Sequence, residues 1–292
     1  MHSFEPNQLS IAQLQNYLQS AVAPRPIAFA STLDENGKPN LAPFSFFNVF
    51  SANPPILIFS PAKKVRDNTN KHTLLNAIVS KEVVINVVNF EIVQQMSLAS
   101  SDYPQGVNEF EKAGLTAIPS DIVKPFRVAE SPIQFECRVN QVISLGDNGG
   151  AGNLVICEVL KMHIHKSVLD QDGNIDQNKV DLVARMGGNL YSRANKGLFE
   201  IAKPVSKLGI GVDNIPKFIK ESGVFDGNDL GKLANIESLP TPEEIAIFVK
   251  TNFEIKSVLS TADEQKIQQK AKDLIAQELV AEAWKLLLAK RV

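Results

Sequence analysis

The sequence predicts a mainly β protein, with an antiparallel sheet that can close into a barrel, followed by a helical extension. Three observations support this fold class. Short apolar runs separated by turn signals fill the first two thirds of the 292-residue chain. Residues 133–140 alternate apolar and polar side chains, as a half-buried strand does. From Pro204 onward, capping boxes precede runs with helical periodicity. We therefore expect two domains, residues 1–203 and 204–292.

Local signals justify the elements of the first domain in order. Ser10 and Gln13 fit a capping box that begins a short helix ending near residue 21. The two prolines that flank Arg25 force extended backbone. Asn36-Gly37 predicts a hairpin turn, because both positions tolerate positive φ. The expected strands are 27–33, 41–50, 56–60, 83–88, 133–139 and 154–164.

The extension has the pattern of amphipathic helices. Thr241 to Glu244 is a capping box with proline at the first helical position, and a second capping signal begins at Thr261. Apolar residues then recur every four positions from Ile267 to Leu287. This stripe predicts one amphipathic helix of about 28 residues, which covers the barrel or lies on a partner subunit.

Composition excludes several classes of protein. The net charge of −2 provides no field for nucleic acid, whose binding needs clustered cations. No apolar run approaches the roughly 20 residues that span a bilayer, so we expect no membrane segment. The first residues lack the basic region and apolar core of a signal peptide. We therefore expect a cytoplasmic location.

The inventory of catalytic and metal-binding side chains is poor. His163 and His165 lie two apart on an expected strand, so both would point to one face, but no third ligand has suitable spacing. Cys137 and Cys157 fall inside strand patterns and are expected to be buried structural thiols. The glycine-rich run 146–152 precedes a strand, so it does not fit a dinucleotide fingerprint; it is either a mobile hairpin loop or a substrate-lining loop. We expect neither a catalytic nucleophile nor a metal.

The informative stretch is 23–73. Residues 42–48 place small, hydroxyl, amide and aromatic groups at the end of a strand. Residues 60–66 and 69–73 then combine hydroxyls with cations on a loop that enters a helix. Such a loop suits a phosphate, through charge-assisted hydrogen bonds and backbone N–H groups. A solvated basic loop is the alternative.

Seven short motifs occur together in this chain, at 23–32, 40–48, 54–55, 59–60, 84–88, 152–155 and 184–191. As a linked set they resemble the flavin reductase-like proteins, which are FMN-binding split-barrel domains. The resemblance covers about residues 8–204. It implies a six-stranded antiparallel split barrel with peripheral helices, usually a homodimer, with FMN in a groove near the subunit interface. The C-terminal helical extension is similar to that of longer family members.

The resemblance also implies which residues hold the cofactor. Those expected at the flavin ring and ribityl chain are Ser31, Thr32, Ser45, Phe46, Phe47 and Asn48. Those expected at the phosphate are Ser60, Arg66, Lys71 and Thr73. Arg185 and Tyr191 match a position close to cofactor or substrate. Two motifs depart from the family pattern. Lys71-His72-Thr73 stands where Lys-Asp-Thr is common, and Gly146-Asp147-Asn148 stands where many flavin reductases have Gly-Asp-His, with its histidine near the nicotinamide.

The implied activity is hydride transfer from NADH or NADPH to FMN. The cofactor carries this chemistry, so the chain needs no catalytic residue of its own. The implied partners are flavin and nicotinamide nucleotides, with a monooxygenase or another electron acceptor. Arg25 either stabilises the reduced flavin or is a surface arginine. One alternative is an FMN electron carrier that serves a protein partner, and another is a flavin-free binding module. Pyridoxamine-phosphate oxidases share the barrel, but the matched motifs are those of the flavin reductase branch.

Overall fold

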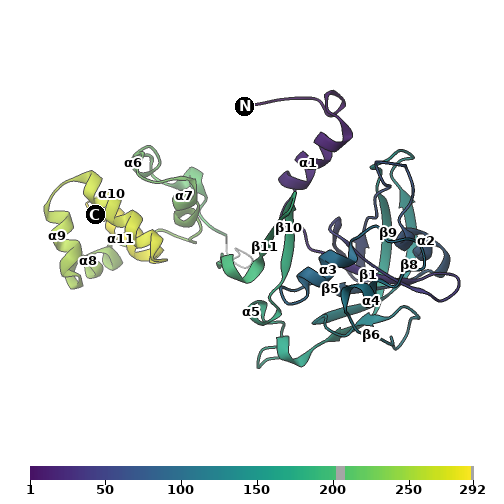
Figure 1. Cartoon of the computed structure of the whole chain (residues 1–292). Coiled ribbons are helices and arrows are strands. Elements are labelled where there is room, and N and C mark those ends of the chain that lie inside the picture. The colour runs from purple at the N-terminus through teal and green to yellow at the C-terminus, as the bar shows by residue number, and fades with distance from the viewer. Residues whose placement is uncertain (202–207, 291–292) are drawn as a thin grey trace. The chain divides into compact units, whose positions relative to one another are not determined.

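The chain divides into two compact units, Met1–Phe199 and Glu200–Val292 (Figure 1). The computed structural model describes residues 1–201 and 208–290. The expected domain boundary between residues 203 and 204 lies outside the described residues, so it stays a prediction. A search of the described helices finds no segment with the length and apolar character to cross a membrane.

The first unit is built on a seven-stranded antiparallel sheet (Figure 1). The strand order is β2-β1-β5-β8-β9-β4-β3. The strands are β1 Ala28–Leu33, β2 Pro39–Phe44, β3 Phe47–Ala52, β4 Pro55–Phe59, β5 Glu82–Val87, β8 Ile133–Ser144 and β9 Asn153–Ile164. Two short antiparallel pairs lie outside this sheet: β6 Ala117–Ile118 with β7 Arg127–Val128, and β10 Val183–Gly187 with β11 Leu190–Arg193. The predicted mainly β class is confirmed.

The connection from β2 to β3 explains why the sheet curls into a barrel. The two strands lie at opposite edges of the sheet, yet only Ser45 and Phe46 join them. Such a short link requires the two edges to come together. The backbone N–H of Ser60 donates to the Phe46 carbonyl at 2.8 Å and extends the β3–β4 pairing up to this link. The single strand expected over 41–50 is therefore wrong: this run forms the end of one edge strand and the start of the other.

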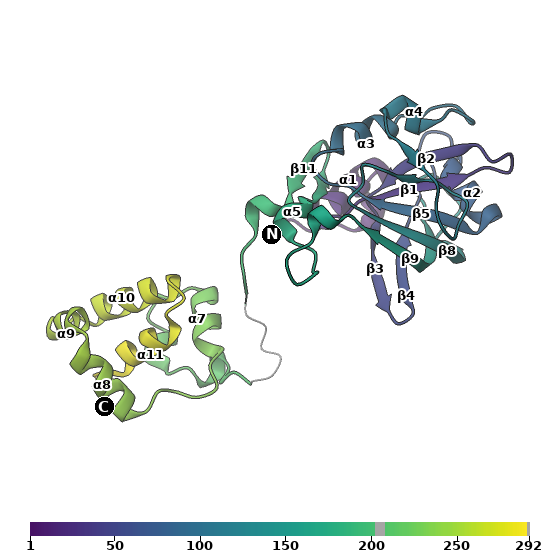
Figure 2. The same ribbon diagram turned by 90° about the horizontal axis from the view of Figure 1, so that it is seen from below.

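Helices pack on both faces of the sheet (Figure 2). Alternation along β1 separates the faces, because successive side chains of a strand point opposite ways. Ala28 and Ala30 join the cluster around Leu74 of one helix, whereas Phe29 packs with Phe110 on the other face. The helices of this unit are α1 Ile11–Ala21, α2 His72–Ser80, α3 Val93–Ala99, α4 Glu109–Ala113 and α5 Gln177–Val180. The predicted capping box of α1 is confirmed: Ser10 and Gln13 bond reciprocally.

The second unit consists of helices around its own apolar core. They are α6 Lys217–Lys220, α7 Gly227–Ala234, α8 Pro242–Thr251, α9 Phe253–Ser260, α10 Glu264–Ala276 and α11 Val280–Leu288. Trp284 is completely buried, and its indole N–H donates to the Leu233 carbonyl at 2.9 Å. The predicted capping box at Thr241 and Glu244 begins α8.

The single long helix predicted after Thr261 is wrong. The chain turns between α10 and α11, where Glu278 adopts the left-handed conformation with φ of 61°. The apolar stripe continues through this turn, because Ile275 before it and Ala283 after it pack into the same core. A period of four residues cannot distinguish one long helix from two helices folded onto a shared core.

Candidate functional site

Two hollows run along the edge strand β2. They share Pro43 and Ser100 in their walls, and together we call them the β2 groove. The hollow at the start of α2, the α2 end, has a volume of about 70 Å³. The other, the β10 end, has a volume of about 200 Å³. The α2 end is lined by residues of β2, by Lys71, His72 and Thr73, and by residues 99–103 and Glu109. The β10 end is lined by Ile27, Pro43, Ser45, Met96, Ser100, Arg185 and Tyr191.

The α2 end presents free hydrogen-bond donors. Lys71 is the N-cap of α2, and its carbonyl accepts from the N–H groups of Leu74 and Leu75. The N–H groups of His72 and Thr73 have no partner among the described residues. The Lys71 ammonium likewise makes no hydrogen bond or ion pair there. A helix N-terminus with free N–H groups and a nearby ammonium attracts an anion.

Buried amides hold the wall of this end in place. The Asn40 amide donates to the Thr73 hydroxyl at 2.8 Å and to the Thr32 hydroxyl at 3.3 Å. Asn76 of α2 also donates to Thr32, at 3.1 Å. Thr32 is completely buried and therefore braces β1, β2 and α2. The Thr73 hydroxyl accepts from Asn40 and keeps its own hydrogen for a further bond.

Three cations gather around Asp102 at the α2 end: Lys64, Arg66 and Lys71. Lys64 and Arg66 contact the Asp102 carboxylate at 2.6 and 3.2 Å, and Arg66 also contacts Asp67 at 3.1 Å. The hydrogen bond from Lys64 is the main cause that lowers the pKa of Asp102, and the charge of Lys71 adds to it. Three cations thus face Asp102 and Asp67, and the buried carboxyl of Glu109 lines the same hollow.

Glu109 lies in the wall of the α2 end and was missed by the sequence reasoning. Its side chain is buried, and its Oε2 accepts from the Leu41 N–H of β2 at 2.9 Å. Burial raises the pKa of this carboxyl, although the backbone hydrogen bonds oppose the shift. Residues 99–103 were missed as well; the only signal was the hydroxyl-bearing run Ser100-Ser101 before Asp102.

The β10 end carries an arginine held in a fixed position. The Arg185 Nη1 donates to the Tyr191 hydroxyl at 2.8 Å, and its Nη2 donates to the Gly188 carbonyl at 2.8 Å. The guanidinium carbon lies 4.7 Å from the centre of the Tyr191 ring. These contacts fix the orientation of the side chain on β10.

The structure brings five of the twelve predicted cofactor residues into the β2 groove: Ser45, Lys71, Thr73, Arg185 and Tyr191. Arg66 is exposed and reaches the groove through its ion pair with Asp102. Ser31 is completely buried on β1, and its hydroxyl has no hydrogen-bond partner among the described residues. Thr32 lies behind the groove wall in the amide network described above.

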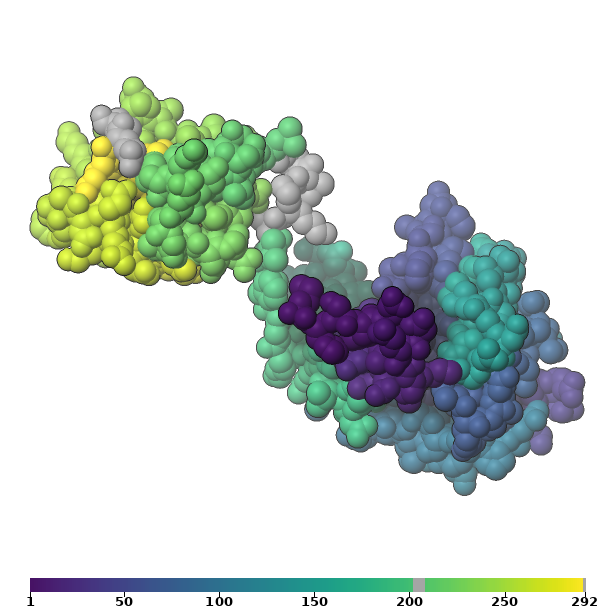
Figure 3. Space-filling view, turned by 90° about the horizontal axis from the view of Figure 1, so that it is seen from above, coloured from purple at the N-terminus to yellow at the C-terminus, as the bar shows by residue number. Residues whose placement is uncertain are grey.

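The remaining four predicted residues lie elsewhere. Phe46 borders a separate apolar hollow between α1 and Gly150, where Figure 3 shows the N-terminal segment beside the loop at 146–152. Phe47 packs on the core cluster inside the barrel. Asn48 is exposed on β3 and bonds the next backbone N–H. Ser60 is buried, and its hydroxyl accepts from the Asn153 N–H at 3.0 Å. These four do not line the β2 groove.

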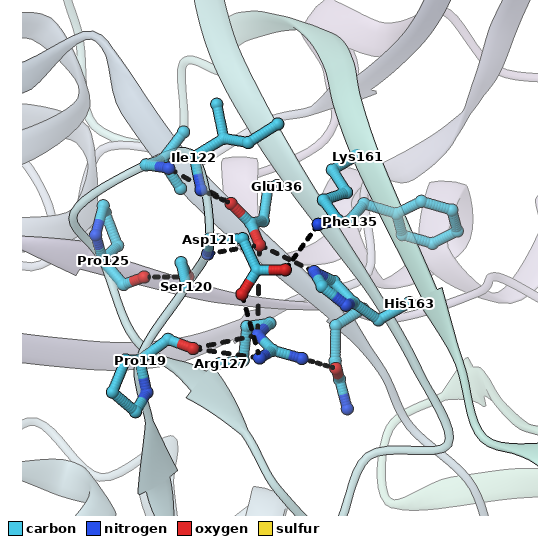
Figure 4. A network of polar contacts seen from close by, with 12 residues as sticks. Pro119, Ser120, Asp121, Ile122, Pro125, Arg127, Phe135, Glu136, Lys161 and His163 are labelled. Atoms are coloured by element: carbon cyan, nitrogen blue, oxygen red, sulfur yellow. Dashed lines mark hydrogen bonds and ion pairs between the residues drawn. The ribbon is translucent and has the colours of Figure 1, made fainter.

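A second polar cluster lies away from the groove, around Glu136 of β8 (Figure 4). Glu136 is completely buried, and its carboxylate accepts from the N–H groups of Asp121, Ile122 and Val123 at 2.6–3.1 Å. His163 of β9 contacts it at 2.6 Å. Burial alone would raise the pKa of Glu136, but these hydrogen bonds outweigh it and lower the pKa to about 2.

Cations already occupy this cluster. Oxygen and nitrogen atoms of Asp121, Glu136 and His163 lie within 4.8 Å of one another, a spacing that could hold a metal ion. However, Lys161 contacts Asp121 at 2.5 Å, and Arg127 lies within 4.0 Å of both carboxylates. The cluster therefore ties residues 121–123 to the sheet. The expected pairing of His163 with His165 on one strand face is wrong, because His165 lies past β9 and caps a short 3₁₀-helix.

Comparisons with known proteins agree with this architecture. A family model described as "Flavin reductase like domain" matches residues 20–184. An uncharacterised protein of Aquifex aeolicus is 38% identical over 173 residues, covering 59% of this chain and 86% of the relative.

Two solved structures are also similar to this chain. Nitrilotriacetate monooxygenase component B from Bacillus cereus is 29% identical with a TM-score of 0.64, covering 70% of this chain and 98% of that one. The 2-nitrobenzoate 2-nitroreductase NbaA of Pseudomonas fluorescens is 25% identical with a TM-score of 0.63, covering 72% of this chain and all of that one. The family match spans more than half of the chain and includes β2 and α2, while Arg185 and Tyr191 of the groove lie just beyond it. On this evidence the chain belongs to the flavin reductase-like family.

Proposed function

We propose that the chain is an FMN-binding oxidoreductase that holds FMN in the β2 groove and reduces it with NADH or NADPH. The observation that carries the proposal is the donor set at the α2 end. It combines the free ammonium of Lys71, the unpartnered N–H groups that begin α2 and the nearby cations Lys64 and Arg66. These are the groups that a phosphate monoester needs.

The rest of the groove fits the remainder of the cofactor. The β10 end is the larger hollow, and its walls combine the apolar side chains of Ile27, Pro43 and Met96 with the polar groups of Ser45 and Arg185. Small-molecule sites have this character, with apolar walls and a few polar groups that fix orientation. We assign the phosphate to the α2 end and the ring system to the β10 end.

Bound FMN would supply a hydride acceptor, and the residues of the chain would bind and orient it. Lys71 and the start of α2 hold the phosphate, and Thr73 donates its free hydroxyl hydrogen to it. Asn40 keeps the Thr73 hydroxyl in position through their 2.8 Å hydrogen bond. Ser45 sits at the seam between β2 and β3, where it can bond the polar edge of the ring system.

The electron donor is tested by bleaching. Protein saturated with FMN should lose its visible flavin absorbance when NADH or NADPH is added without oxygen, and dithionite should bleach it equally in every sample. Comparing the two nicotinamide nucleotides assigns the preferred donor. Bleaching by dithionite with no response to either nucleotide would contradict the proposed reductase activity.

That contrary result would favour a second function, an FMN electron carrier for a protein partner. The observation behind it is the loop at 146–152, which carries Asn148 where many flavin reductases have histidine. The backbone of this loop is held by other residues: the Asp147 carbonyl accepts from Lys63 at 3.1 Å and from Asn68 at 3.0 Å. Among possible acceptors we include a monooxygenase, in view of the similarity to a protein named as a monooxygenase component.

We further propose that the protein acts as a homodimer. The edge strand β3 supports this, because Val49 and Phe50 on it are 62% and 63% exposed. The β3–β4 hairpin projects from the barrel (Figure 2). Exposed apolar edge strands favour association, and a two-fold pair would cover the same strand in both copies.

The proposed activity does not depend on thiols. Cys137 and Cys157 are completely buried in the barrel core, and burial raises the pKa of both above the ordinary value for cysteine. The double variant Cys137→Ala/Cys157→Ala should therefore bleach bound FMN at the wild-type rate. Its stability should fall modestly, because each substitution leaves a small cavity. A folded double variant that binds FMN but cannot reduce it would overturn this expectation.

A further inference from the structure

Two arginines of the first unit lack a carboxylate partner. Among the six arginines in the described part of the chain, four lie within 4.0 Å of an aspartate or glutamate: Arg66, Arg127, Arg138 and Arg193. Arg25 and Arg185 do not contact a carboxylate of the described residues. Arginine always carries its charge, so an uncompensated guanidinium leaves a local positive field.

The two unpaired arginines are neighbours. The backbone N–H of each donates to the carbonyl of the other at 2.9 Å. Arg25 is 6% exposed, and its guanidinium donates to the carbonyls of Gln19 and Val22 at the end of α1. Burial lowers the pKa of Arg25, and the positive charge of Arg185 lowers it further, so the two charges act on one another.

Arg185 presents this charge to the β10 end of the groove. Its guanidinium carries five N–H donors, and the bonds to Tyr191 and Gly188 use two of them. The remaining donors suit an oxyanion, since a guanidinium fork matches carboxylate and phosphate geometry. The proposed FMN phosphate lies at the α2 end, where Lys71 already provides a cation, so the β10 end has a cation for a second anion.

We propose that Arg185 anchors an oxyanion of the second substrate, the molecule that exchanges electrons with the bound flavin. The charge of Arg25 adds to the positive potential at Arg185, and Tyr191 orients the Arg185 guanidinium. This inference rests on the proposed function, because it takes the groove to hold FMN. The oxyanion is either the carboxylate of a small aromatic acid or the pyrophosphate of the nicotinamide nucleotide, which share the chemistry that a guanidinium recognises.

Calorimetric titrations of the full chain, with and without saturating FMN, test the inference. Benzoate probes the carboxylate and ADP probes the pyrophosphate, while benzamide and adenosine are their uncharged counterparts. At least one anion should bind more tightly than its uncharged counterpart. Arg185→Met should weaken the binding of that anion by about 10- to 100-fold, because a charged hydrogen bond is lost. Arg185→Lys should restore part of the affinity. Arg138→Met is the control: Arg138 pairs with Glu158 outside the groove, so this variant should bind the anion as the wild type does.

FMN titrations of the same variants separate this inference from the proposed function. FMN affinity in Arg185→Met should fall by clearly less than the anion affinity, since Arg185 lines the ring end of the groove and the phosphate is held at the α2 end. A loss of FMN affinity as large as the loss of anion affinity would assign Arg185 to the cofactor and overturn the inference. Equal binding of charged and uncharged probes would also overturn it. Wild-type protein that binds an anion through Arg185 but never binds FMN would refute the proposed function and leave only the anion site at Arg185.

Discussion

Replacing Lys71 with alanine is expected to weaken FMN binding by about 10- to 100-fold. The Lys71 ammonium makes no hydrogen bond or ion pair with the described residues, so the variant removes a phosphate contact without breaking an internal one. A charge-assisted hydrogen bond contributes about 1.5–3 kcal/mol, which corresponds to this loss of affinity. Quenching of flavin fluorescence during titration measures it.

The companion variant Thr73→Val tests the hydroxyl at the same end. Valine keeps the branched shape but removes the group that accepts from Asn40 at 2.8 Å, so affinity and thermal stability should both fall. Lys124→Ala is the matched control, because Lys124 is an exposed lysine outside the groove. If Lys71→Ala binds FMN as tightly as the wild type, the assignment of the phosphate to the α2 end is wrong.

The variant Glu136→Gln should destabilise the barrel unit by on the order of 3 kcal/mol, because breaking a buried charge network leaves its partners uncompensated. Glutamine has one acceptor oxygen in place of two, whereas the wild-type carboxylate accepts from three backbone N–H groups and contacts His163. The melting temperature of the barrel should fall by roughly 6–12 °C. Scanning calorimetry is the suitable measurement, since the one tryptophan, Trp284, belongs to the helical unit.

The loss of stability caused by Glu136→Gln should depend on pH in a direction that the pKa of Glu136 determines. The pKa of Glu136 falls from 4.5 to about 2 in the folded chain. A group with a depressed pKa stabilises the fold fully above its unfolded pKa and loses that contribution as the pH falls through the folded value. The difference between wild type and Glu136→Gln should therefore be constant above about pH 5 and shrink toward pH 2.

A surface pair on the same strands provides the control. Glu158 of β9 contacts Arg138 at 2.9 Å, and the Arg138 side chain is 58% exposed. Surface ion pairs contribute about 0–1 kcal/mol, so Glu158→Gln should change the melting temperature little. Equal losses in Glu136→Gln and Glu158→Gln would contradict the structural role assigned to the buried carboxylate.

Sequence patterns predicted the strands well, because their signals are local. The alternation at 133–139 and the turn at Asn36-Gly37 depend on neighbours along the chain, and the structure has both the strand and the turn, with Gly37 at φ of 77°. The split at Ser45 and the turn at Glu278 escaped prediction. Both are set by packing between distant segments: the closing edges of the barrel in one case and a shared helical core in the other.

Part of the β2 groove could be predicted, because some of its residues carry a local sequence signal. Lys71 and Thr73 lie in a run whose cations and hydroxyls signal an anion site. Glu109 and residues 99–103 enter the groove only because α3 and α4 pack beside β2, which no local pattern encodes. Glu136 was read as an outward polar residue of a half-buried strand, whereas a loop covers it and its carboxylate bonds that loop.

The separation of the apolar clusters has an evolutionary consequence. Every residue of the cluster around Trp284 comes from the segment 210–288, and the barrel clusters draw only on residues 27–183. A lineage could therefore gain or lose the C-terminal helices by gene fusion or truncation without repacking the apolar clusters of the barrel. Selection could then change the C-terminal helices in different organisms while the barrel of the ancestral flavoprotein was conserved.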